Sequence, residues 1–191
     1  MDLLFIKKFV SVNYCYLWLI IHIQYYGKKV LVRVDFNVTI NNGAVTEDYR
    51  IRSAIPTIEY LVKRGAKVIL ASHLGRPKSP DHNNSLAPVA ARLKEILDRN
   101  VDFVGDCIGT QVKSKIENLR YGNILLLENL RYYSEEQNND LEFSESISSL
   151  ADIYVNDAFS TSHRKHASTY GAVKNFDIRL AGFSLKKEIE Y

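Results

Sequence analysis

The clearest pattern in the chain is a series of short apolar runs that each end in polar residues. The first run lies within KVLVRVDFN, where Val30, Leu31, Val32 and Val34 lead to Asp35 and Asn37. A run that is apolar on both faces predicts a strand buried in the middle of a sheet, with helices covering both sides. Similar runs predict further strands at 68–71, 101–104, 124–127 and 153–155, and a sixth at 180–183.

Helical periodicity fills the intervals between these runs. Residues 49–64 carry apolar side chains at helical spacing; we expect Pro56 to break this helix in two and Gly65 to end it. Ser85 is expected to cap a helix that continues to Leu97. Further helices are predicted at 109–119, at 140–150 and from 184 onward. This alternation predicts an α/β fold with a doubly wound parallel sheet, Rossmann-like and three-layered (α/β/α), in a single domain.

Composition narrows the class of protein. The chain has 191 residues, 46% hydrophobic and 25% charged, which is typical of a soluble globular domain. Its net charge of +3 comes without a long run of Lys or Arg, so we expect no nucleic-acid partner. Cys15 and Cys107 lack metal-ligand spacing, so no metal site is predicted, and their number favours a reducing, cytoplasmic location.

The first 26 residues form an apolar, aromatic-rich leader that differs from the rest of the chain. Its uninterrupted apolar core, Leu17 to Ile21, is far shorter than the ~20 residues that a bilayer requires. No small-residue cleavage site follows it, which argues against a signal peptide. We therefore expect no membrane association. The leader is expected either to pack on the domain or to lie outside the natural fold.

Polar side chains stand where the predicted strands end. Because the carboxyl ends of parallel strands meet at one edge of a sheet, these side chains should converge there. Guanidinium groups bind phosphate and carboxylate oxygens in a two-pronged way, so the expected ligand is a small molecule with more than one negative charge. The candidates are Asp35, Asn37, Arg50, His73, Arg76, Arg131 and Arg164, with His163 and His166 close to the last of them.

Each candidate taken alone has a simpler explanation. An arginine after a strand is usually a solvated charge, Asp35 could cap a loop, and His73 could be a satisfied core histidine. Loops that end alike after several strands favour the site interpretation, and we interpret Glu128 and Asn129 as a loop brace. The chain has no GxxxxGK[ST] loop and no GxGxxG after its first strand, which argues against a nucleotide site and against half of an NAD-dependent dehydrogenase.

Five motifs together give the chain a family resemblance. Over residues 27–191 it resembles the amino-terminal domain of phosphoglycerate kinase, although Ser160 stands where that family often has Gly. The apolar leader at 1–26 does not match the family. For the rest, the resemblance implies a phosphoglycerate-binding domain at 27–184 and the start of an interdomain hinge helix at 185–191. The motifs are VRVDFNV at 32–38, DYRIRSAIPTI at 48–58, SHLGRP at 72–77, LLLENLRYY at 125–133 and VNDAFSTSHRKHAS at 155–168.

The resemblance also implies an activity. The family transfers a phosphoryl group reversibly between 1,3-bisphosphoglycerate and ADP, giving 3-phosphoglycerate and ATP in glycolysis. This chain would supply the phosphoglycerate-binding half and be inactive alone, as a monomer. No cofactor is expected on it, because the family binds MgATP or MgADP on the other domain. The alternative is a non-catalytic binding or interaction module that needs a separately supplied nucleotide-binding half.

Residue roles follow from the same resemblance. Arg50 would be the catalytic cation that steadies the transferring phosphoryl group. Asp35 and Asn37 would orient the hydroxyl end of the substrate. Its phosphate and carboxylate would be clamped by His73, Arg76, Arg131 and Arg164.

Overall fold

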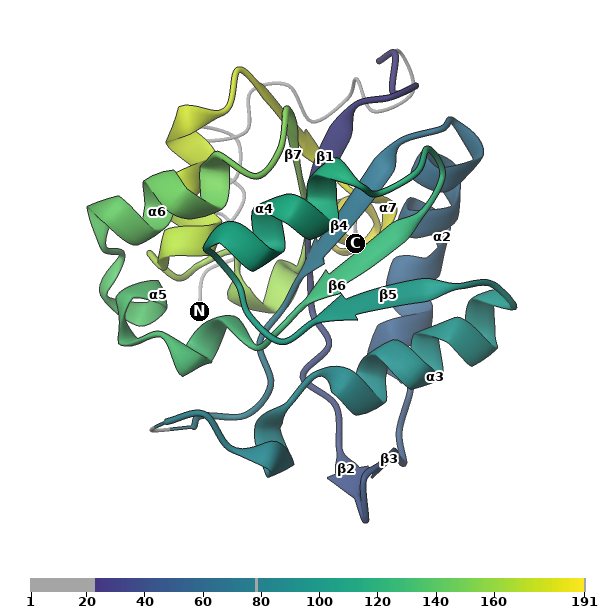
Figure 1. The fold of residues 1–191 in the computed structure, drawn as a ribbon, viewed down its shortest axis with the longest axis vertical. Helices are drawn as coiled ribbons and strands as arrows, with labels where there is room; N and C mark the ends of the chain where they lie inside the picture. The colour runs from purple at the N-terminus through teal and green to yellow at the C-terminus, as the bar shows by residue number, and fades with distance from the viewer. Residues whose placement is uncertain (1–22, 78, 191) are drawn as a thin grey trace.

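A single parallel sheet organises the chain. The computed structural model describes residues 23–77 and 79–190, so most of the predicted leader lies outside the described residues. The strand order is β5-β6-β4-β1-β7-β8 and every neighbouring pair is parallel, which confirms the predicted fold class (Figure 1). The strands are β1 (Lys29–Val34), β4 (Lys67–Ala71), β5 (Val101–Val104), β6 (Ile124–Leu127), β7 (Ile153–Asp157) and β8 (Ile178–Ala181).

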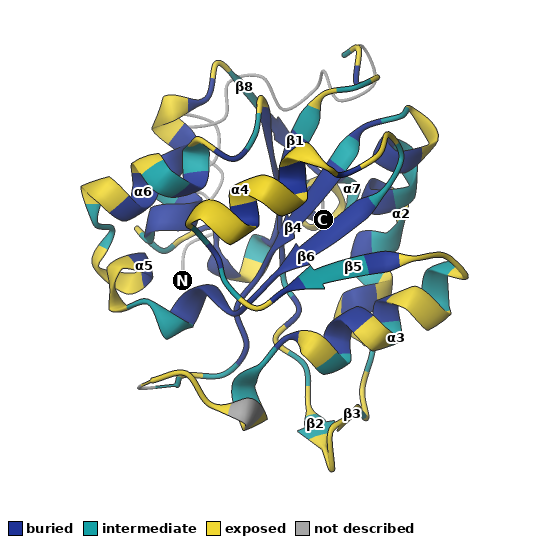
Figure 2. Cartoon of the chain, in the orientation of Figure 1, coloured by how far each residue is buried: buried dark blue, intermediate teal, exposed yellow. Residues whose placement is uncertain are grey.

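Helices cover both faces of this sheet, which explains why the strands are apolar on both sides. One hydrophobic cluster joins the sheet to α2 (Tyr49–Lys63) and α3 (Ala87–Leu97), and α7 (Phe183–Glu190) packs on α2. A second cluster joins the opposite face to α4 (Thr110–Glu117) and α6 (Leu141–Ser148). Figure 2 shows buried strands between helices whose outer faces are exposed.

Short elements complete the connections. A tight turn joins β2 (Ile40–Asn41) to β3 (Ala44–Val45), and Asn42 and Gly43 both have positive φ, as such a hairpin turn requires. The remaining elements are η2 (His82–Asn84), η3 (Leu130–Tyr132), α5 (Ser134–Asn138), η4 (Phe159–Thr161), the π-helical η5 (Ala167–Gly171) and η6 (Ala172–Asn175).

The prediction that Pro56 breaks its helix was wrong. Helix α2 runs without interruption through Pro56. Proline costs about 3 kcal/mol inside a helix because it lacks the N–H group. Here Ile51 before it and Ile58 after it are both fully buried against the sheet, and this burial holds the two halves in one helix.

Some element boundaries also differ from the prediction. Leu86, not Ser85, occupies the capping position of α3, although the Ser85 hydroxyl still accepts a hydrogen bond from the Ala87 N–H at 3.2 Å. The sixth strand lies at 178–181, two residues earlier than predicted, because Ile178 pairs with Ile153 of β7.

Among the described residues, none of the helices has the length and apolar character that crossing a membrane requires.

Candidate anion-binding site

The carboxyl ends of the strands form a pocket lined almost entirely by hydrogen-bond donors. The segments that follow β1, β4, β6 and β7 each contribute to a cavity of about 240 Å³, and none of its described lining residues is acidic. Five of the seven predicted site residues therefore lie together. The lining residues are Asn37, His73, Gly75, Arg76, Arg131 and Arg164.

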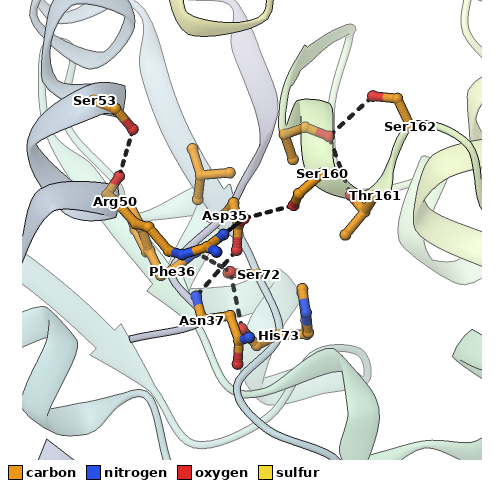
Figure 3. Close-up of polar contacts among 12 residues, drawn as sticks. Asp35, Phe36, Asn37, Arg50, Ser53, Ser72, His73, Ser160, Thr161 and Ser162 are labelled. Carbon is orange, nitrogen blue, oxygen red and sulfur yellow. Dashed lines mark hydrogen bonds and ion pairs between the residues drawn. The ribbon is translucent and has the colours of Figure 1, made fainter. Parts of the chain in front are cut away.

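The other two predicted residues, Asp35 and Arg50, lie beside this cavity. Both line a neighbouring pocket of about 720 Å³ between α2, α7 and η4. Figure 3 shows Arg50 reaching from α2 to the Asp35 carboxylate, which also accepts a hydrogen bond from the Ser160 hydroxyl at 2.6 Å. The other Asp35 oxygen accepts from the Asn37 N–H at 3.2 Å. The loop from Asp35 to Asn37 thus joins the two pockets.

Glu128 and Asn129 brace the loops around the cavity, as the sequence predicted. Asn129 accepts from the Leu74 N–H at 3.1 Å and donates to the Leu74 carbonyl at 2.7 Å. Glu128 accepts from the Leu86 and Asn129 N–H groups, both at 2.8 Å. These bonds tie the segments after β4 and β6 to each other and to the start of α3.

Gly75 is required where the loop after β4 turns. Its φ is +62°, and a Cβ atom there would lie 2.3 Å from the Asn84 Oδ1. The Gly75 carbonyl accepts from the Arg131 Nη1 at 2.6 Å, and its N–H donates to the Asn37 Oδ1 at 2.8 Å. A glycine therefore lets three of the loops meet.

Like charges raise the electrostatic potential of the cavity. Burial, together with the positive charges of Arg164, Arg33 and Arg76, lowers the pKa of Arg131 to about 10. Burial is also the main reason that the pKa of His73 falls to about 2, with Arg33, Arg131 and Arg164 lowering it further. His73 is therefore neutral at physiological pH. A cavity of this kind favours an anion that restores charge balance.

Arg33 was not among the residues predicted for the site. Its side chain lies in the central strand, is 1% exposed, and donates to the His73 Nδ1 at 3.1 Å. The available signal was a single charge inside an otherwise apolar strand, which indicates a buried, paired group. His163, in contrast, is exposed and lies outside the cavity lining.

His166 is half-buried and does not line the cavity either. Burial, followed by the charges of Arg131 and Arg164, lowers the pKa of His166 to about 4. Within residues 23–77 and 79–190, no three His, Cys, Asp or Glu side chains are grouped so that they could hold a metal ion.

Comparisons with known proteins agree on one family. A sequence profile described as "Phosphoglycerate kinase" matches residues 20–191. A phosphoglycerate kinase from Dictyoglomus turgidum is 56% identical over 164 residues, which cover 86% of this chain and 41% of the relative. A chloroplastic phosphoglycerate kinase from Arabidopsis thaliana is 54% identical over 166 residues, covering 86% of this chain and 34% of the relative.

A solved structure extends this likeness to the fold. The phosphoglycerate kinase from Coxiella burnetii superposes with a TM-score of 0.81 at 36% identity, covering 90% of this chain and 42% of the other. The chain spans about two fifths of the length of its Dictyoglomus relative. The motifs, the sheet and these matches together place the chain in the phosphoglycerate kinase family.

Proposed function

We propose that this chain is the phosphoglycerate-binding half of a phosphoglycerate kinase. It would hold 3-phosphoglycerate or 1,3-bisphosphoglycerate, while a second half carries MgADP or MgATP. The supporting observation is the cavity at the strand ends, where three arginines and a neutral histidine gather and none of the described lining residues is acidic. A three-carbon acid that carries a phosphate at one end and a carboxylate at the other matches this arrangement in charge.

The roles of the residues follow their positions. Arg76, Arg131 and Arg164 would clamp the phosphate and carboxylate oxygens from three sides. Asn37 and Asp35 would orient the hydroxyl end of the substrate from the loop that joins the two pockets. Phosphoryl transfer depends mostly on positioning and on neutralising charge, and these groups supply both.

Arg50 would act at the border of the two pockets. Its side chain is 47% exposed in its ion pair with Asp35, so it is accessible from the larger pocket. A phosphoryl group that approaches from a second half would meet this guanidinium first. Arg50 would then neutralise charge on the transferring group, which is the catalytic role that the family resemblance implies.

The remaining assignments belong to the same proposal. Residues 27–184 form the binding domain, and 185–191, within and after α7, begin the hinge helix. The chain works as a cytoplasmic monomer with no cofactor of its own and no nucleic-acid or membrane partner. Some relatives are chloroplastic, so cell fractionation is the test of the cytoplasmic assignment.

A binding experiment tests the proposal directly. Calorimetric titration of the 191-residue chain with 3-phosphoglycerate should show binding that weakens as salt is added. Arg131→Ala should lower the affinity about tenfold or more, because charge-assisted hydrogen bonds are lost. Lys113→Ala, which removes an exposed charge on α4, serves as the control and should change nothing. Equal affinity in wild type and Arg131→Ala would refute the proposal.

The second candidate function is a non-catalytic module that joins a separately supplied nucleotide-binding half. The observation in its favour is the larger pocket, where Phe159 and Phe183 form part of the wall and Tyr49 is 79% exposed. Mixing the chain with such a half should form a complex during gel filtration. A chain that stays monomeric in the mixture would argue against this candidate.

A further inference from the structure

Arg33 makes a set of directed contacts inside the central strand. Its Nε donates to the Ser168 Oγ at 3.0 Å, and its Nη1 donates to the Val34 carbonyl. Its Nη2 lies 3.1 Å from the Nδ1 of His73. All three side chains are at most 5% exposed, so water does not compete for these bonds.

The contact with Arg33 determines which nitrogen of His73 carries the proton. A guanidinium group has only donors, so the His73 Nδ1 must accept and the proton of the neutral ring must lie on Nε2. The imidazolium form would place an N–H group against the Arg33 guanidinium. The charged or titratable groups around His73 are Arg33 from β1, Arg131 from η3, and Arg164 and His166 from the segment after β7. All of them oppose a second positive charge.

The other end of Arg33 is oriented as strictly. The Ser168 hydroxyl accepts from Arg33 and donates its own proton to the Glu136 Oε1 at 2.6 Å. The Glu136 Oε2 accepts from the Ser168 N–H at 2.9 Å, and Glu136 is 1% exposed. The buried charge of Arg33 is thereby balanced through a hydroxyl. Arg33 donates in both directions, on one side to Ser168, which donates on to Glu136, and on the other side to His73.

We propose that Arg33 is a positioning residue that holds His73 as the neutral Nε2–H tautomer, so that the ring presents a donor to an anion in the cavity. This inference rests on the proposed binding of phosphoglycerate. Because Nδ1 is committed to Arg33, Nε2 is the ring nitrogen left for a ligand. The donor is uncharged, so it serves the ligand equally across physiological pH. It favours ionised oxygens over hydroxyl oxygens, because the ionised oxygens are the stronger hydrogen-bond acceptors.

The test is a nitrogen NMR spectrum of the 15N-histidine-labelled 191-residue chain, with His73 assigned by its loss in His73→Gln. We expect an unprotonated Nδ1 and a protonated Nε2 for His73, unchanged between pH 5 and pH 8. A proton on Nδ1, an averaged signal, or a titration within this range would overturn the proposal. This readout needs neither a ligand nor a variant of Arg33.

Variants of Arg33 connect the tautomer to binding. Arg33→Met should average the two tautomers of His73 and lower the affinity for 3-phosphoglycerate about tenfold. Arg33→Lys, which restores a charged donor, should recover part of both effects. A spectrum and an affinity that remain unchanged in Arg33→Met would overturn the proposal. If Arg33→Met does not fold, the wild-type spectrum and Arg33→Lys decide the question.

The outcomes separate this inference from the proposed function. A wild-type chain that has the Nε2–H tautomer but does not bind 3-phosphoglycerate refutes the proposed function, and with it the ligand role of His73. A wild-type chain that binds 3-phosphoglycerate with a protonated Nδ1 refutes only the role of Arg33.

Discussion

Two pockets lie side by side at the same edge of the sheet, and they differ in how their charges are arranged. The smaller is lined by three arginines, a neutral histidine, Asn37 and Gly75, and braced loops hold it together. The larger contains both signs, and its most prominent charges, Arg50 and Asp35, are already paired. The difference teaches that one edge of a parallel sheet can carry two kinds of site. In the smaller pocket the cationic groups are already arranged for an anion, whereas in the larger pocket the ion pair of Arg50 with Asp35 must break before Arg50 can bind a ligand.

The largest expected effect concerns the larger pocket. The purified 191-residue chain should show no ATP-dependent turnover in a coupled assay. By the proposed function the nucleotide is bound by a second half, so no second substrate would be held next to Arg50. Losing the proximity of two bound reactants costs about 7–11 kcal/mol of barrier. Measurable turnover that co-purifies with the chain would contradict this prediction. Addition of a nucleotide-binding half should restore activity if the two halves dock.

The brace of the smaller pocket should matter for stability. Asn129→Ala leaves the Leu74 and Arg131 N–H groups and the Leu74 carbonyl without their partner. Each buried unpaired group costs about 1–3 kcal/mol, so we expect a loss of about 3 kcal/mol in the free energy of unfolding. Urea denaturation measures it. Asn118→Ala, at the exposed end of α4, is the control, and a similar loss in both variants would argue against a brace.

The free energy of unfolding should depend on pH through Asp157, which lines the larger pocket. Its Oδ1 accepts from the Ser184 and Leu185 N–H groups at the start of α7, yet burial raises the pKa of Asp157 to about 7. The folded chain therefore binds a proton that the unfolded chain releases near pH 4, and stability falls as pH rises from about 4 to about 7. Asp157→Asn keeps the acceptor and removes the charge.

At pH 8 this variant should exceed the wild type in free energy of unfolding by more than about 1.4 kcal/mol, the equivalent of one pKa unit. The difference should vanish near pH 4. Comparison of the two chains also removes the contribution of His73 and His166. Because their pKa values lie below those of free histidine, they reduce stability as pH falls below about 6.5. A constant difference across pH would contradict the assignment to Asp157.

The smallest expected effect compares one arginine from each pocket. Arg50→Ala breaks a half-exposed ion pair, so the free energy of unfolding should change by less than about 1 kcal/mol. Binding of 3-phosphoglycerate should weaken, but by less than in Arg131→Ala, whose side chain is 5% exposed within the smaller pocket. Calorimetry of both variants checks the order. An unchanged titration for Arg50→Ala would exclude it from the binding site.

The sequence alone determined the fold and much of the pocket. Largely apolar runs such as 30–34, in which Arg33 is the one charged residue, identify strands because burial between two helix layers favours apolar side chains. Once the sheet is parallel, its carboxyl ends share one edge, which is why Asn37, His73 and Arg131 could be predicted as neighbours. The predicted break at Pro56 was wrong because the local rule for proline ignores packing. Burial of the helix before and after Pro56 keeps α2 continuous.

Only the tertiary structure decided which charges act and which are already engaged. Asp35 and Arg50 carry no sequence mark that assigns them to a second pocket. The state of His73 depends on Arg33, and that of Arg33 on Ser168 and Glu136, which are far apart in the chain. The pattern of buried positions can be read from residues that are close in the sequence. The position of a proton, in contrast, depends on every group that the fold brings within hydrogen-bond distance.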